Sequence, residues 1–107
     1  MLGFIFKRRN LLYKNIYGKT ITKINYIHDY MQIYFNDNGI LNLYNKTMIN
    51  ENENLFINKA VNDIFTIKNK LIISCNKDLF IEMSMLDKDY VEPESFEYNN
   101  KDITIVG

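Results

Sequence analysis

Hydrophobic and polar residues alternate along much of this chain with a period of two. In the clearest stretch the apolar positions are Met31, Ile33 and Phe35, and the intervening positions are Tyr30, Gln32 and Tyr34. Such alternation predicts a half-buried β-strand. The run Asn-Asp-Asn-Gly follows at residues 36–39, and Asn and Gly tolerate the positive φ of tight turns. Since Leu41 and Leu43 then resume the apolar face, we expect a β-hairpin over residues 30–44.

The pattern of residues 18–45 returns in residues 58–85 at an offset of forty. The matching apolar positions are Ile21 and Val61, Ile24 and Ile64, Met31 and Leu71, Ile33 and Ile73, and Phe35 and Cys75. Self-similarity of this kind indicates a repeated structural unit. We therefore predict two three-stranded meanders, the second with strands near 60–67, 70–75 and 79–85. The turn of the second hairpin is about two residues shorter in the second copy. This predicts that the offset of forty between equivalent residues is lost after that turn.

The strand signals add up to roughly seven to nine short strands, which predicts an all-β fold with room for one short helix. The expected architecture is an antiparallel sandwich or a partly open barrel. We expect one β domain over residues 1–107: an N-terminal arm at 1–17, the two meanders, and closing strands within 94–106 around a turn at Asn99-Asn100. Residues 10–17 fit either a strand or a short helix, and the polar run 46–58 predicts a loop with a brief helical turn.

The expected core consists of the apolar positions on one face of these strands. They are Ile21, Ile24, Met31, Ile33, Phe35, Leu41, Leu43, Val61, Ile64, Leu71, Ile73, Leu79 and Ile81. With 47% hydrophobic residues, the 107-residue chain can bury such a core without a cofactor.

The cysteine content, the N-terminal apolar run and the net charge limit the cellular location and the class of partner. The single cysteine, Cys75, excludes an intrachain disulfide and fits a reducing, cytoplasmic location. The apolar run at residues 1–6 precedes its charges and is far shorter than a membrane span, so we expect an arm packed on the domain, with membrane-surface or partner docking as the alternative. A net charge of zero and a pI near 6.6 argue against nucleic-acid binding.

Charge is unevenly distributed along this neutral chain. Six basic residues precede the first acid, Asp29, whereas residues 82–102 hold seven acids against two lysines. The segments either steer a charged partner or neutralise each other.

The chain lacks the residue patterns of a catalytic or metal site. His28 and Asp29 are neighbours in a predicted turn, where side chains point in different directions, and Cys75 is expected to be a buried structural thiol. Asp87 and Asp89 lack the further oxygen ligands and the glycine of a calcium loop. We therefore expect no enzyme activity and no cofactor.

The face of the first hairpin opposite the core is rich in tyrosine. Tyr30, Tyr34 and Tyr44 lie there, and they are either covered by the N-terminal arm or form a patch that anchors a protein interface.

Several of these motifs together resemble a group of small bacterial β-proteins. The matching features are a Gly-led strand at Gly18, the hairpin from Tyr30 to Tyr44, a degenerate second copy, and Pro93-Glu94-Ser95-Phe96 followed by the closing apolar strand 103–106. Residues 18–106 are similar to immunity proteins of polymorphic toxin systems, including contact-dependent growth inhibition systems. The basic N-terminal arm has no counterpart in that pattern.

The resemblance implies a cytoplasmic protein that binds one cognate toxin domain and blocks it, with a nuclease expected as the toxin. Since such toxins often have cationic clefts, acids of the C-terminal segment are candidates for the contact. The candidate binding residues are Asp87, Asp89, Glu92, Glu94 and Glu97, together with Tyr30, Tyr34 and Tyr44. An exposed edge strand offers β-augmentation as a second binding mode. The alternative function is a structural or regulatory β-module that forms a homodimer.

Overall fold

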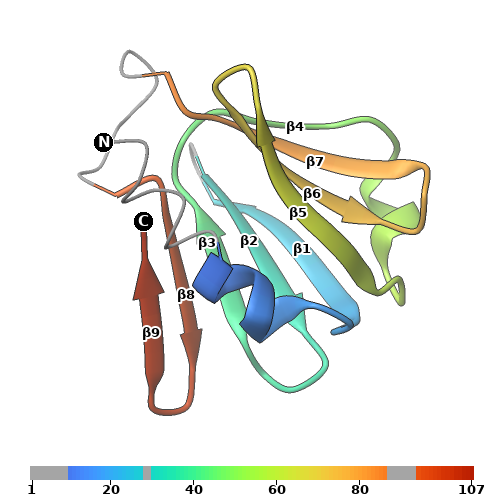
Figure 1. Ribbon diagram of the computed structural model, residues 1–107. Helices are drawn as coiled ribbons and strands as arrows, with labels where there is room; N and C mark the ends of the chain where they lie inside the picture. Colours follow the sequence, from blue (N-terminus) through green and yellow to red (C-terminus); the bar gives the residue numbers. More distant parts are fainter. Residues whose placement is uncertain (1–9, 28–29, 87–93) are drawn as a thin grey trace.

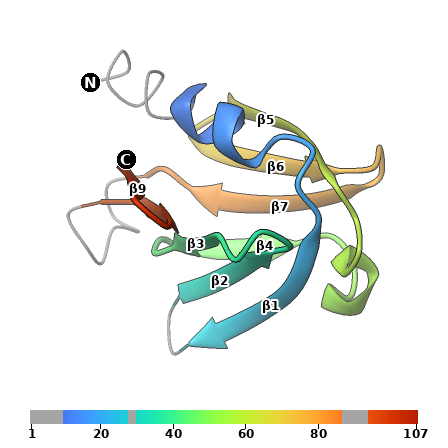
Figure 2. The same ribbon diagram turned by 90° about the horizontal axis from the view of Figure 1, so that it is seen from below.

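The computed structural model describes residues 10–27, 30–86 and 94–107, and it shows an all-β sandwich of two antiparallel sheets (Figure 1). Seen from below, β5, β6 and β7 lie on one side and β1 and β2 on the other (Figure 2). The two sheets do not close into a barrel. The predicted all-β sandwich is therefore confirmed.

The first sheet has five strands in the order β1-β2-β3-β8-β9, and the second has four in the order β4-β7-β6-β5. The bounds of the first sheet are β1 Ile21–Ile27, β2 Tyr30–Phe35, β3 Ile40–Leu43, β8 Phe96–Asn100 and β9 Ile103–Val106. Those of the second are β4 Thr47–Ile49, β5 Val61–Ile67, β6 Lys70–Cys75 and β7 Leu79–Ser84. A short α-helix covers residues 10–16, and a 3-10 turn, η1, spans Glu53–Phe56.

The predicted repeat is present as two equivalent meanders, β1-β2-β3 in the first sheet and β5-β6-β7 in the second. Both carry a β-bulge at the start of their first strand, and their registers match: Ile24 pairs with Ile33 as Ile64 pairs with Ile73. The prediction that the match slips at the second hairpin was wrong. Ile33 pairs with Leu41 and Ile73 with Ile81, so the offset of forty persists through the third strand, because the two turns span the same number of register positions.

The two copies meet at an isolated antiparallel bridge between Thr20 and Ala60, which are themselves equivalent residues. Four backbone hydrogen bonds flank it in two symmetric pairs. The N–H groups of Ile21 and Val61 donate to the carbonyls of Lys59 and Lys19, both at 2.9 Å, and those of Gly18 and Asn58 donate to the carbonyls of Val61 and Ile21, at 2.8 and 2.7 Å. A pseudo-two-fold axis therefore passes between Thr20 and Ala60.

Each copy enters this junction through a residue with positive φ. Gly18 has φ +78° and Asn58 has φ +68°. Before them, Ile16 and Phe56 end the helix and η1 respectively, and both are fully buried. The repeat thus includes the preceding helical turn. The sequence of residues 10–17 fitted either a strand or a short helix. In the structure residues 10–16 form a helix, and its apolar face packs on the core.

Each copy also passes its fourth strand to the other sheet. After β3 the chain crosses over, and β4 pairs with β7; after β7 it crosses back, and β8 pairs with β3. Equivalent hydrogen bonds mark the crossings: Tyr44 N–H donates to Ser95 O, and Ser84 N–H donates to Lys46 O, both at 2.8 Å. The run 46–58, predicted as a loop with a helical turn, therefore contains the short strand β4 as well as η1.

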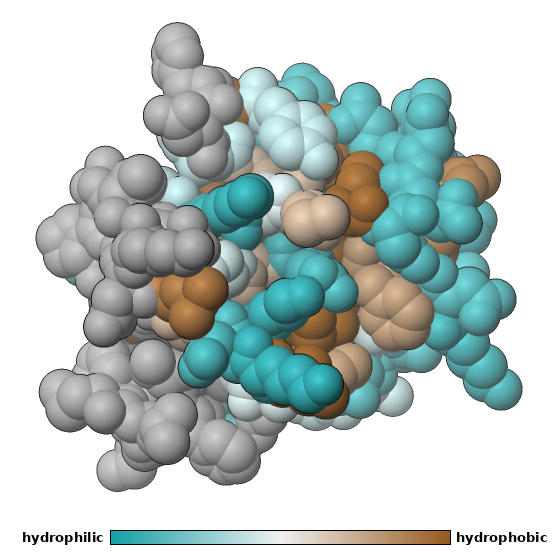
Figure 3. Space-filling view, turned by 90° about the horizontal axis from the view of Figure 1, so that it is seen from above, coloured by the Kyte–Doolittle hydropathy of each residue, from teal (hydrophilic) through white to brown (hydrophobic). Residues whose placement is uncertain are grey.

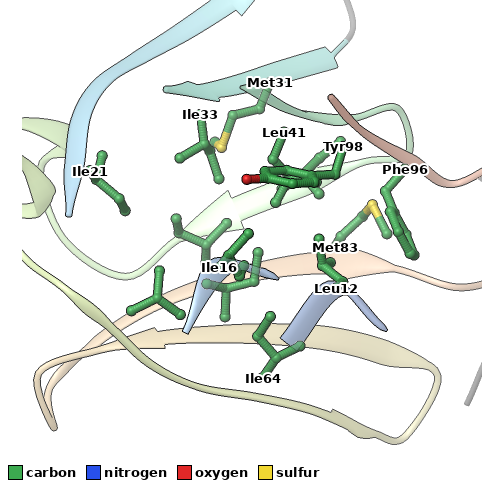
Figure 4. Close-up of a cluster of buried hydrophobic side chains, with 14 of the residues drawn as sticks. Leu12, Ile16, Ile21, Met31, Ile33, Leu41, Ile64, Met83, Phe96 and Tyr98 are labelled. Atoms are coloured by element: carbon green, nitrogen blue, oxygen red, sulfur yellow. The ribbon is translucent and has the colours of Figure 1, made fainter. Parts of the chain in front are cut away.

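The core fills the space between the sheets (Figure 4). Every predicted core residue is buried, and the structure adds to this core Leu12, Ile16, Phe56, Cys75, Met83, Phe96, Tyr98 and Ile105. The closing hairpin was predicted to turn at Asn99-Asn100, which is wrong. Both residues belong to β8, and the turn lies at Lys101-Asp102, where Lys101 adopts φ +51°.

Candidate protein-binding face

The outer face of the five-stranded sheet gathers most of the chain's distinctive polar and aromatic side chains. Because strand residues alternate between faces, the burial of Met31, Ile33 and Phe35 directs their neighbours outward. We call this surface the tyrosine face. It consists of Tyr30, Gln32, Tyr34, Asn42, Tyr44, Glu97 and Asn99.

Two of the tyrosines touch and one of them binds an acid on a distant segment. The ring centroids of Tyr30 and Tyr44 lie 5.4 Å apart, and the Tyr44 hydroxyl donates to Glu97 Oε1 at 3.2 Å. Desolvation, and then the negative charge of Glu97, raises the pKa of Tyr44 to about 12. The Tyr44 phenol therefore stays protonated and remains a hydrogen-bond donor at any physiological pH.

Asn42 lies near the middle of the tyrosine face, directly between Gln32 on β2 and Glu97 on β8. Only 9% of Asn42 is exposed, although its side chain is on the outer face. Its Oδ1 atom accepts no hydrogen bond from any residue that the structure describes. Buried amide oxygens are nearly always paired, so this orphan acceptor sets Asn42 apart from ordinary surface asparagines.

The rest of the tyrosine face is held in place by its own hydrogen bonds. Asn99 Nδ2 donates to Glu97 Oε1 at 3.1 Å, and the Thr104 hydroxyl donates to Asn99 Oδ1 at 2.9 Å. The Tyr34 hydroxyl donates to Gln32 at 3.2 Å, and Lys23 Nζ lies 5.6 Å from the Tyr34 ring centroid. These contacts involve side chains of β1, β2, β8 and β9, and they preorganise the surface.

The structure brings together four of the eight predicted binding residues: Tyr30, Tyr34, Tyr44 and Glu97. Glu94 lies just before β8 and is partly exposed. Asp87, Asp89 and Glu92 lie outside the described residues. Asn42 was missed by sequence reasoning, since an asparagine between Leu41 and Leu43 reads as a plain solvent-facing residue.

The outer face of the four-stranded sheet has a different character. Figure 3 shows the molecule from above, and apolar and polar residues are interspersed on the surface seen there. Met48 is exposed, Phe65 and Phe80 are partly exposed, and the single acid of this face in β7, Glu82, pairs with Lys70 at 3.4 Å. Its charge is thus already matched within the chain.

A second polar cluster lies where the turn after β2 meets the end of β8. Lys19 pairs with Asp37 at 2.5 Å and donates to the Tyr98 hydroxyl at 3.0 Å, while Asn100 Nδ2 donates to Asp37 and to Tyr98. A Cβ on Gly39 would come within 2.6 Å of the Tyr98 hydroxyl, so this position excludes larger residues. The Tyr98 ring itself lies in the core (Figure 4).

This cluster shifts two pKa values in a consistent way. Desolvation raises the pKa of Asp37, but hydrogen bonds from Lys19 and the Gly39 N–H outweigh it, so the pKa is lowered. Desolvation lowers the pKa of Lys19, but Asp37 and Tyr98 outweigh it, so the pKa is raised. An open cavity of about 290 Å³ borders Asp37 and Asn100. The polar groups of the cluster form hydrogen bonds and an ion pair with one another. These interactions link Tyr98 and Asn100 of β8 to Lys19 and Asp37 of the first copy.

The cysteine and the acidic side chains of the described residues were also weak candidates for chemistry in the sequence. Burial raises the pKa of the Cys75 thiol to about 11, which keeps it protonated and unreactive. Within residues 10–27, 30–86 and 94–107, no group of three or more His, Cys, Asp or Glu side chains could hold a metal ion. No helix in the same ranges has the length and apolar character needed to cross a bilayer. His28 and Asp29, weighed as a dyad, lie outside them.

Comparisons with protein-family models, curated proteins and solved structures give no match to this chain. The tyrosine face therefore has to be interpreted from its own geometry and chemistry.

Proposed function

We propose that this protein is an immunity protein: it uses the tyrosine face to bind a cognate toxin domain in the cytoplasm and neutralises it without catalysis. The proposal joins the resemblance of residues 18–106 to immunity proteins with the surface that the sheet presents. One observation carries it: three partly exposed tyrosines and a carboxylate meet on one preorganised sheet face.

Tyrosine suits such a role for physical reasons. It offers a large apolar ring and a polar hydroxyl at a small cost in side-chain entropy, and it is enriched at interface hot spots. The rings of Tyr30 and Tyr44 already contact each other, and Tyr34 and Tyr44 already donate hydrogen bonds. A partner that docks here loses less free energy in ordering these side chains.

Charge supports a cationic target such as the cleft of a nuclease. Glu97 lies on the tyrosine face, and Glu94 lies three residues before it. The other acids of this segment, Asp87, Asp89 and Glu92, follow β7 in sequence. Acids on and near an aromatic anchor, as Glu97 is on the tyrosine face, would speed association with a basic surface and make it sensitive to salt.

The test is binding to the purified toxin domain encoded by the neighbouring gene. Tyr44→Ala should weaken binding by roughly 30-fold or more, the effect of a hot-spot residue. Phe65→Ala is the matched control, because Phe65 is a partly exposed aromatic residue on the outer face of the other sheet. Affinity lost in the control and kept in Tyr44→Ala would contradict the proposed face.

The acidic contribution is tested separately by reversing the charge of all five acids, Asp87, Asp89, Glu92, Glu94 and Glu97. Association should slow and lose most of its salt dependence. Unchanged affinity and salt dependence would exclude the acidic contact. A concentration-dependent self-dimer that Tyr44→Ala abolishes, seen by sedimentation of the protein alone, would instead establish a homodimeric β-module.

A further inference from the structure

We propose that the tyrosine face seats an arginine side chain of the partner protein, with the guanidinium group bound between Glu97 and Asn42 and packed against the Tyr44 ring. This inference rests on the proposed function, since it names the chemistry by which the same face recognises its partner. It comes from two acceptor atoms to which none of the described residues donates a hydrogen bond.

The first acceptor is Asn42 Oδ1, which is buried and has no hydrogen-bond partner in the described part of the chain. The second is on Glu97. Both hydrogen bonds that Glu97 receives from described residues, from Tyr44 and from Asn99, end on Oε1. Within that part of the chain, Oε2 therefore remains available to a partner.

These two acceptors are close neighbours. Asn42 and Glu97 are direct cross-strand partners on β3 and β8, and both side chains are on the outer face. Directly opposed residues of antiparallel strands have Cβ atoms about 4.5–5.5 Å apart. Tyr44 follows Asn42 by two positions, so its side chain is on the same face and beside the same pair.

An arginine matches this arrangement better than any other side chain. Its guanidinium group is planar and carries five N–H donors in a fork, so it can serve two neighbouring acceptors at once. It also stacks on aromatic rings, and Tyr30 and Tyr44 provide them. A donor that reaches Asn42 Oδ1 would remove the cost of leaving a buried amide oxygen unpaired.

The site must open slightly to admit its ligand. Because Asn42 Oδ1 is buried in the free protein, a guanidinium can reach it only after a side chain that covers this atom moves. We infer that the partner's arginine first contacts Glu97 Oε2 and then reaches the amide.

In the second copy, the position equivalent to Asn42 is Glu82, and its surroundings differ from those of Asn42. Glu82 stands where Asn42 stands in the first copy, and Lys70 on the neighbouring strand pairs with it at 3.4 Å. The chain thus supplies its own cation on the second sheet, whereas none of the described cations pairs with Glu97.

The experiment follows the backbone and side-chain amide NMR signals of the whole protein during titration with an N-acetyl Gly-Arg-Gly amide peptide. We expect saturable shifts at Asn42, Tyr44 and Glu97, including the Asn42 side-chain amide, with an affinity in the millimolar range. The same peptide with citrulline, which has the shape of arginine without its charge, should give no saturable shift there. A lysine peptide should bind more weakly, since it lacks the planar fork.

Glu97→Gln removes the charge with little change in shape and should weaken binding of the arginine peptide by roughly tenfold. Glu82→Gln, on the other sheet, should leave that binding unchanged. Equal responses to arginine and citrulline, or shifts that move with Glu82 and ignore Glu97, would overturn the arginine site.

The failure of each proposal gives a distinct result. A toxin complex that needs Tyr44, combined with no arginine response, refutes the arginine site and leaves the proposed function standing. An arginine response at Glu97, combined with no complex with the neighbouring-gene toxin, refutes the proposed function and leaves the arginine site standing.

Discussion

The two meanders share their inner faces and differ almost completely on their outer faces. Inward, Ile24 and Ile33 of the first copy correspond to Ile64 and Ile73 of the second, in the same register. Outward, the equivalent pairs are Gln32 and Ile72, Tyr34 and Ser74, Asn42 and Glu82, and Tyr44 and Ser84. The shared face determines the fold, while the divergent face is free to carry recognition.

The difference also separates the two sheets in how they satisfy their own polar groups. The second sheet pairs Glu82 on its outer face with Lys70. In the first sheet, no described residue donates a hydrogen bond to Asn42 Oδ1. A buried polar atom without a partner destabilises a protein, and the arginine proposed for the tyrosine face would supply the missing donor at Asn42.

The largest test of the equivalence lies in the core. Ile33→Ala and Ile73→Ala each remove a side chain that is almost fully buried on the middle strand of its meander. Each should lower the free energy of unfolding by about 2–5 kcal/mol, because burial is lost and a cavity remains. Urea unfolding of both variants measures this. If one substitution costs less than about 1 kcal/mol, the two inner faces are not energetically equivalent.

A smaller effect is expected where the copies enter their junction. Gly18→Ala should cost about 1–2 kcal/mol, since φ of +78° strains a side-chain-bearing residue while nothing lies within 4 Å of the added Cβ. Gly18→Asn should be close to neutral, because asparagine occupies the equivalent position at Asn58 with φ +68°. Chemical denaturation distinguishes the two. An equal loss for alanine and asparagine would show that side-chain bulk, and not backbone conformation, selects glycine here.

The smallest effect is expected at the ion pair that only the first copy has. Asp37→Asn should cost at most about 1 kcal/mol at neutral pH, since both partners are partly exposed. The pKa of Asp37 is lowered from its ordinary value of 3.8 in the folded protein. The ion pair therefore stabilises the folded protein at pH values above 3.8, and this stabilisation is lost as the pH falls through the lowered pKa.

Unfolding curves of wild type and Asp37→Asn should therefore converge in acid. Lys59→Met is the control, because Lys59 is equivalent to Lys19 but Lys77 stands in the place of Asp37. The control should change stability by less than the Asp37 variant does at neutral pH. A difference between wild type and Asp37→Asn that persists at acid pH would show that Asp37 acts through packing.

Alternation and turn residues were sufficient to predict most of the fold. The strands of the second meander were expected at 60–67, 70–75 and 79–85 and are found within one residue of those limits. β4 was missed because three residues, Thr47–Ile49, are too few to show a period. The helix at 10–16 remained undecided since only two buried residues, Leu12 and Ile16, mark its inner face.

The candidate site was only half visible in the sequence. The alternation of faces along a strand places Tyr30, Tyr34 and Tyr44 on one face, because all three belong to the same hairpin. The pairing of Asn42 with Glu97 depends on β8 docking against β3, across fifty-five positions of chain. No local pattern encodes that docking, so the acceptor pair emerges only from the tertiary structure.

The exchange of β4 and β8 between the sheets makes the two copies interdependent. If the first meander separated from the second, β4 would have to leave β7 and β8 would have to leave β3. Partial unfolding of either copy therefore breaks pairing in both sheets, and we expect the protein to unfold in one cooperative step. For a binding surface built on one sheet, such interlocking means that its rigidity is maintained by the whole molecule.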